Sequence, residues 1–195
     1  ASLPAAGVKV FFIISGFLIT SLLLKETSER QEVSISAFYV RRACRILPAF
    51  IVYLATIYAL ARSGVISVPV ESFVWSGSFL CNVPEANCTW WLAHTWSLGV
   101  EEQYYLAWPA LFIFLGKWRS RGMALALGAL LAASPFFPIS LSFAHIAIGA
   151  LYALSSTTRR IVDRLGTGKL IVVFTALVLS LPLFASFDVV HKIMK

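Results

Sequence analysis

Residues 38–48 read Phe-Tyr-Val-Arg-Arg-Ala-Cys-Arg-Ile-Leu-Pro, so that three arginines stand directly before a long apolar run, Ile46–Ala61. Only Tyr53, Thr56 and Tyr58 are mildly polar within that run. A membrane-spanning helix needs ~20 predominantly apolar residues, with a range of about 17–25, and the run nearly fits. Arginine is costly to bring into hydrocarbon, so a cluster at the entrance of such a helix requires an explanation.

Two explanations suit these arginines. Basic residues commonly anchor the cytoplasmic end of a membrane helix, and charge alone favours this reading. The alternative is a binding site for a phosphate-rich or otherwise anionic ligand, because a guanidinium group pairs with oxyanions through two parallel hydrogen bonds. Arg42 and Arg45 lie three residues apart and would share one face of a helix.

The overall composition predicts an integral membrane protein. Hydrophobic residues make up 59% of the chain and charged residues only 13%, whereas soluble domains carry about 25% charged residues. The net charge of +7 does not indicate nucleic-acid binding, because the basic residues form short patches between apolar runs.

Hydropathy predicts an all-α, polytopic transmembrane bundle of about six helices. The break at residues 134–138, with Pro135 and Pro138, removes backbone donors and predicts a tight hairpin between the fourth and fifth helices. A single kinked helix is the weaker alternative. The apolar segments are Val8–Leu24, Ile46–Ala61, Leu98–Leu115, Met123–Pro138, Leu141–Leu154 and Leu170–Phe187.

The basic residues predict an orientation for this bundle. In an alternating topology, twelve of the 16 basic residues fall on one side, which the positive-inside rule makes cytoplasmic. The long polar connection at about 62–95 is then an extracytoplasmic loop. The twelve are Lys25, Arg30, Arg41, Arg42, Arg45, Lys117, Arg119, Arg121, Arg159, Arg160, Arg164 and Lys169.

Cys81 and Cys88 lie seven residues apart in that loop, with Pro84 between them. This spacing suits a disulfide in an oxidising compartment, and two free buried thiols are the alternative. Cys44 lies on the predicted cytoplasmic side and is expected to be a small packing residue.

Candidate chemistry is concentrated around residues 94–105, which read His-Thr-Trp-Ser-Leu-Gly-Val-Glu-Glu-Gln-Tyr-Tyr. Glu101 and Glu102 cannot share one helix face, because consecutive residues are ~100° apart. They are either acids near the positive end of a helix dipole or intramembrane acids with a function. Ser15 and Gly16 interrupt the first apolar run and are expected to allow close helix packing rather than to supply a nucleophile. No Cys/His spacing of a metal site is present.

Three stretches together resemble the signature sequences of the acyltransferase-3 family of membrane acyltransferases. They are Phe-Phe-Ile-Ile-Ser-Gly-Phe-Leu-Ile-Thr at 11–20, the arginine stretch at 38–48, and His-Thr-Trp-Ser-Leu-Gly-Val-Glu-Glu-Gln-Tyr-Tyr-Leu-Ala-Trp-Pro at 94–109. They occur in the family's order and at plausible spacing. The resemblance is clear over Val8–Leu115 and fades afterwards.

The resemblance implies an enzyme of the plasma membrane, in bacteria the inner membrane, that spans the lipid several times. It would move an acyl group, often acetyl, from acyl-CoA to a hydroxyl of an extracytoplasmic carbohydrate, with no bound cofactor. The family's Arg-x-x-Arg motif falls on Arg42 and Arg45, which implies acyl-CoA binding. Its Ser-Leu-x-x-Glu element falls on Ser97, Leu98 and Glu101, which implies supporting catalytic roles for Ser97 and Glu101.

The family also carries an arginine and a histidine, the latter credited as general base, on a first transmembrane helix upstream of residues 11–20. That helix and the C-terminal part of the family domain are absent here, so residues 1–195 are expected to be a partial membrane acyltransferase domain and incomplete for catalysis. The alternative is a non-catalytic bundle, transporter-like or a pseudo-enzyme, that binds an anionic ligand through the arginines.

Overall fold

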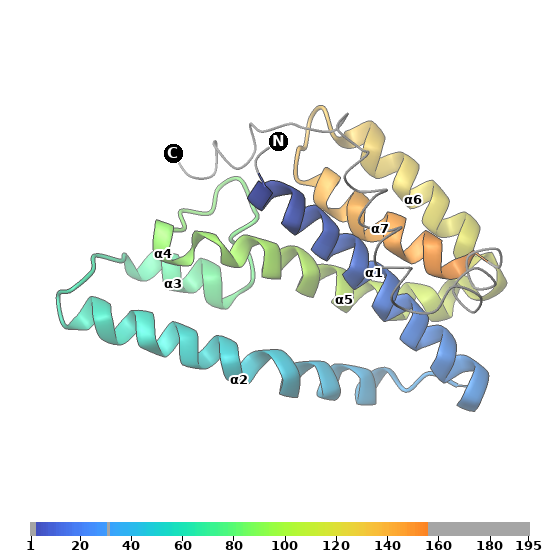
Figure 1. Ribbon diagram of the computed structural model, residues 1–195, viewed down its shortest axis with the longest axis horizontal. Coiled ribbons are helices and arrows are strands. Elements are labelled where there is room, and N and C mark those ends of the chain that lie inside the picture. Colours follow the sequence, from blue (N-terminus) through green and yellow to red (C-terminus); the bar gives the residue numbers. More distant parts are fainter. Residues whose placement is uncertain (1–2, 31, 156–195) are drawn as a thin grey trace.

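The computed structural model describes residues 3–30 and 32–155, which form helices joined by short connections (Figure 1). These residues contain no strand, and the predicted all-α class is confirmed. The elements are α1 (Leu3–Arg30), α2 (Ile35–Arg62), α3 (Val70–Gly77), α4 (Trp90–Ala93), α5 (Thr95–Leu115), the 3₁₀ turn η1 (Gly116–Trp118), α6 (Arg119–Ala133) and α7 (Ser140–Leu154).

α1 packs directly against α7 because glycines let the two backbones approach closely (Figure 1). A Cβ atom on Gly16 would stand 2.0 Å from the Ile146 carbonyl oxygen, and one on Gly149 would stand 2.0 Å from the Ile13 carbonyl oxygen. No side chain fits at either position without moving backbone. The packing role expected for Gly16 is therefore confirmed.

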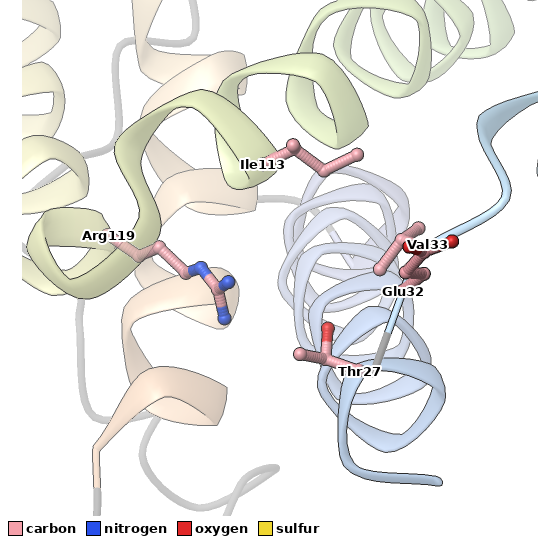
Figure 2. Close-up of a pocket in the computed structure, with 5 residues that line it drawn as sticks. All are labelled: Thr27, Glu32, Val33, Ile113 and Arg119. Atoms are coloured by element: carbon pink, nitrogen blue, oxygen red, sulfur yellow. The ribbon is translucent and has the colours of Figure 1, made fainter. Parts of the chain in front are cut away.

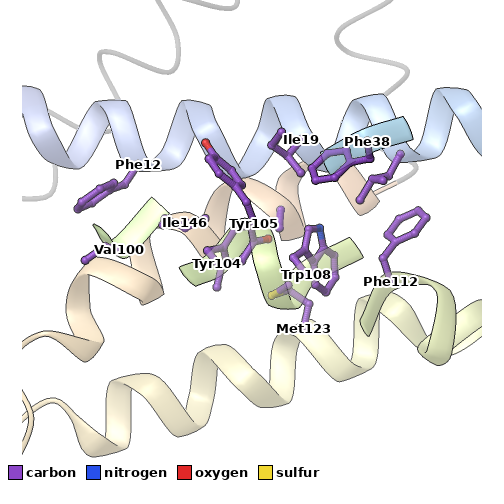
Figure 3. Packing of buried hydrophobic residues seen from close by; sticks show 13 residues of the cluster. Phe12, Ile19, Phe38, Val100, Tyr104, Tyr105, Trp108, Phe112, Met123 and Ile146 are labelled. Atoms are coloured by element: carbon purple, nitrogen blue, oxygen red, sulfur yellow. The ribbon is translucent and has the colours of Figure 1, made fainter. Parts of the chain in front are cut away.

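The apolar core lies between α1, α5, α6 and α7, where large aromatic side chains of α5 face the neighbouring helices (Figure 3). Trp108 is 2% exposed, and its indole N–H donates to the Thr20 hydroxyl across 2.9 Å, so its polar atom is satisfied inside the core. Phe112 and Val100 are fully buried on the same helix. α5 is thus the central helix of the described bundle.

α2 lies beside this bundle rather than within it (Figure 1). Only Phe38, Phe50 and Ile57 of α2 are buried. Long side chains make its contacts with the rest of the chain: Phe50 stacks on Phe79 with ring centroids 4.8 Å apart, and the Tyr39 hydroxyl donates to the Leu106 carbonyl across 2.7 Å. Much of α2 therefore presents an apolar surface.

Among the described residues, α1 and α2 are the helices long and apolar enough to cross a membrane. α6 and α7 have 15 residues each, or about 22 Å of helix, against a hydrocarbon thickness of about 30 Å. The predicted bundle of about six spanning helices is therefore not confirmed. Five of the predicted segments correspond to α1, α2, α5, α6 and α7, and Leu170–Phe187 lies outside the described residues.

The predicted hairpin is confirmed, since α6 ends at Ala133 and α7 begins at Ser140 on either side of the proline break. Two short helices, α3 and α4, form within the connection at 62–95, which hydropathy had indicated only as a polar loop. Pro69 is the N-cap residue of α3 and has an extended backbone conformation.

The start of α2 corrects the sequence prediction. The helix begins at Ile35, eleven residues before the predicted apolar run, because Ser34 caps it and accepts a hydrogen bond from the Ala37 N–H. Pro48 lies inside the helix. The arginines of 38–48 are consequently within α2 and not at its entrance, and Arg42 lies roughly 10 Å along its axis.

Cys81 and Cys88 form a disulfide, with Cα atoms 5.9 Å apart, in the connection between α3 and α4. This is the pairing expected from their spacing. Cys44 differs from the expectation: it is exposed on α2 and does not fill a packed position in the described part of the chain.

The cysteines allow a test of the predicted orientation. In intact cells carrying a Cys44→Ser, Ser120→Cys variant, a membrane-impermeant maleimide should label Cys81 and Cys88 only after mild reduction, since the loop is predicted to be extracytoplasmic. The thiol introduced by Ser120→Cys, among the basic residues that begin α6, should react only after lysis. Labelling at position 120 in unlysed cells, or of the loop cysteines without reduction, would contradict the orientation or the disulfide respectively.

Candidate functional site

Glu101 of α5 is buried, with 3% of its surface exposed. It lies in a cluster of polar side chains that we call the polar centre, made of Ser15, Arg42, Glu101, Glu102 and Tyr105. The Tyr105 hydroxyl, one helical turn later, donates to its Oε1 atom across 2.8 Å. The Ser15 hydroxyl, from α1, donates to the same oxygen. Hydrogen bonds from two hydroxyls compensate a carboxylate for lost water, so the site suits an acid held in a fixed orientation.

Arg42 brings positive charge from α2 to this acid. Its guanidinium carbon lies 3.2 Å from the centroid of the Tyr105 ring. Its Nε atom is 3.9 Å from Oε1 of Glu102, and the two side chains are only 16% and 24% exposed. A largely buried arginine is tolerable where an acid and an aromatic ring face it. Arg42 therefore belongs to the polar centre.

The other arginines of the stretch have different surroundings. Arg45 is exposed, although its position one turn after Arg42 places it on the adjoining part of the helix surface. Arg41 is also exposed and forms an ion pair with Glu26 of α1, with Nη2 and Oε2 3.2 Å apart. Arg42 thus contacts α5, whereas Arg41 pairs with α1.

Ser97 lies one turn before Glu101 and is half-buried. Its hydroxyl donates to the His94 carbonyl across 3.2 Å, the local hydrogen bond that serine often makes in a helix. The structure therefore puts Ser97 near the start of α5 without a contact to Glu101. Its predicted supporting role stays a prediction.

The disulfide loop holds the opposite side of α5. Asn82 and Gln103 exchange two amide hydrogen bonds, of 2.9 and 3.0 Å, and the Gln103 amide also donates to the Phe79 carbonyl across 3.1 Å. Gly99 allows this contact, because a Cβ there would stand 2.5 Å from the same carbonyl oxygen. α5 is thus fixed between the loop on one side and Ser15 on the other.

A pocket of about 290 Å³ lies elsewhere, between the end of α1 and the junction of α5 and α6 (Figure 2). None of its lining residues belongs to the polar centre; they are Thr27, Glu32, Val33, Ile113 and Arg119. The Arg119 Nε donates to the Phe112 carbonyl across 2.9 Å. No group of three His, Cys, Asp or Glu side chains suited to a metal ion occurs in residues 3–30 and 32–155.

Sequence reasoning missed two members of the polar centre. The sequence predicts that Ser15 is a packing residue, yet its hydroxyl donates a hydrogen bond to Glu101, 86 positions away in the chain. A local sequence pattern cannot indicate such a distant contact. Tyr105 was not singled out at all. Its spacing of four from Glu101 places the two side chains on one helix face, so that spacing could have indicated their contact.

Comparison with known proteins identifies the class to which this arrangement belongs. Residues 5–192 match the family model Acyl_transf_3, described as an acyltransferase domain. The match covers Ser15, Arg42, Glu101 and Tyr105 together. The chain belongs to this family.

Bacterial proteins named as O-acetyltransferases are similar to part of this chain. A protein of Staphylococcus aureus (strain COL) is 34% identical over 128 residues, covering 56% of this chain and 20% of the relative. The peptidoglycan O-acetyltransferase OatA of Listeria monocytogenes is 30% identical over 128 residues, covering 57% and 20%. The O-acetyltransferase OatA of S. aureus (strain NCTC 8325 / PS 47) is 31% identical over 127 residues, covering 56% and 20%. The matched region thus spans about a fifth of each relative. No solved structure matches the chain.

Proposed function

We propose that the complete protein is a membrane O-acyltransferase that moves an acyl group, most simply acetyl, from acyl-CoA to a hydroxyl of an extracytoplasmic carbohydrate. Family membership and the names of the relatives support the acyl transfer and a carbohydrate acceptor. The observation that carries the proposal is the buried Glu101, hydrogen-bonded by two hydroxyls beside an arginine of the neighbouring helix.

Arg42 and Arg45 would bind the phosphates of coenzyme A from the cytoplasmic side. Within the described residues the Arg42 guanidinium lies over the Tyr105 ring, and its Nε atom makes no hydrogen bond. Guanidinium donors suit phosphate oxygens because they bind in pairs. Arg45, exposed one turn further along α2, would add a second positive charge.

Glu101 would hold the reacting hydroxyl. Its carboxylate already accepts hydrogen bonds from two hydroxyls, which is the interaction that a sugar hydroxyl would make. In the transfer, the acceptor oxygen bonds to the acyl carbon and the carbon–sulfur bond of the thioester breaks. The hydroxyl proton passes to a general base and finally to the coenzyme A sulfur. Glu101 assists by orienting the groups that exchange this proton.

The test is acyl transfer by the complete protein in membrane vesicles. Radiolabelled acetyl-CoA supplied on the cytoplasmic side should yield label in ester linkage on cell-wall carbohydrate, released by mild alkali. A protein that binds coenzyme A without transferring label would instead favour the alternative, a non-catalytic bundle that recognises an anionic ligand. Label transfer that is independent of the protein would contradict the proposal.

A further inference from the structure

Tyr105 is the side chain through which Arg42 and Glu101 are connected. It is 3% exposed and contacts Glu101 with its hydroxyl and Arg42 with its ring face. In the proposed acyl transfer these contacts describe the surroundings of Glu101 and Arg42, and Tyr105 has no role of its own. We infer that Tyr105 is a positioning residue that holds the donor-binding arginine and the carboxylate in one fixed arrangement; the inference rests on that proposed function.

The ring fixes the guanidinium. Nε of Arg42 and Oε1 of Glu102 are both buried, and neither makes a hydrogen bond within the described chain. Their separation of 3.9 Å is too long for a hydrogen bond, so the attraction between the two charges does not fix the orientation of the guanidinium. The contact of the guanidinium with the Tyr105 ring, 3.2 Å from its carbon to the ring centroid, is therefore the interaction that holds Arg42 in place.

The hydroxyl fixes the carboxylate. Its hydrogen bond to Oε1 of Glu101 joins residues one helical turn apart, so it selects one orientation of the acid on α5. If Tyr105 served only to fill the core, its hydroxyl could bind to any polar group or reach the surface, and the contact with Glu101 would not be needed. Tyr104 offers the contrast: it is also buried, it stacks on Trp108 with centroids 6.0 Å apart, and its hydroxyl makes no hydrogen bond to Glu101.

Two substitutions separate the ring from the hydroxyl. Tyr105→Phe keeps the ring and removes only the hydrogen bond, so we expect kcat to fall about tenfold while KM for acetyl-CoA stays within about twofold. Tyr105→Leu removes both contacts, so kcat should fall and KM for acetyl-CoA should rise about tenfold. Tyr104→Phe is the matched control and should leave both constants unchanged.

Rates are measured in the complete protein and normalised to the amount in the membrane, alongside coenzyme A binding to detergent-purified protein. Coenzyme A affinity should be retained in Tyr105→Phe and weakened in Tyr105→Leu. If Tyr105→Leu does not accumulate, the isosteric Tyr105→Phe decides alone. An unchanged kcat in Tyr105→Phe, or a rise in its donor KM, overturns the role of Tyr105 and leaves the proposed function intact. A wild-type protein that neither binds coenzyme A nor transfers label overturns the proposed function, and this inference with it.

Discussion

Glu101→Gln should lower acyl transfer by about 100-fold, because general-base catalysis contributes about 10²–10⁴-fold and depends on the groups that the Glu101 carboxylate orients. Glutamine has the same shape as glutamate and still presents an oxygen to the Ser15 and Tyr105 hydroxyls, so the hydrogen bonds of the buried acid can persist. What it lacks is the negative charge beside Arg42. The measurement is the initial rate of label transfer, with membrane content determined on the same samples.

Glu102→Gln is the matched control, because it removes the same charge from the next residue of α5. Glu102 is half-buried and faces only Arg42, at 3.9 Å and without a hydrogen bond. Because Oε1 of Glu102 makes no hydrogen bond within the described residues, its replacement removes an attraction to Arg42 without removing a hydrogen-bonded acceptor, and should cost less than tenfold in rate. Equal losses in the two variants would show that Glu101 matters only as one of two nearby charges.

Local patterns were sufficient to predict much of this fold. Hydropathy located α1, α2, α5 and the hairpin of α6 and α7, because apolar runs bounded by charges and prolines mark helices regardless of their neighbours. The spacing of Cys81 and Cys88 likewise indicated their disulfide, which closes a short loop.

Features that depend on distant partners were not predictable in this way. Hydropathy placed the start of α2 too late, because arginines lower the mean hydropathy of a segment even where that segment is helical. Arg42 of α2 is largely buried because Tyr105 and Glu102 of α5 contact its guanidinium. These two residues are more than fifty positions away in the chain. Ser15 and Glu101, on α1 and α5, form the same kind of long-range pair. Such contacts depend on how the helices pack against one another, and that packing cannot be read from a single sequence.

Arg42→Lys should reduce donor use about tenfold or more, even though the charge is conserved. Lysine carries a point charge on a flexible stem and reproduces neither the contact of the guanidinium with the Tyr105 ring nor the paired hydrogen bonds to phosphate. A cation–π contact is worth about 0.5–2 kcal/mol, and 1.4 kcal/mol corresponds to a factor of ten. The expected change is a rise in KM for acetyl-CoA, measured with protein content in the membrane.

The neighbouring arginines provide the comparison. Arg41→Lys should be tolerated, because a lysine can still pair with Glu26 at the exposed end of α1. Arg45→Lys should have an intermediate effect, since Arg45 is exposed and has no aromatic partner among the described residues. If the arginines served only to orient the helix, lysine would replace each of them freely, because the positive-inside rule counts lysine and arginine alike. Normal transfer by an Arg42→Lys, Arg45→Lys double variant would therefore refute donor binding and leave anchoring as the reason for these residues.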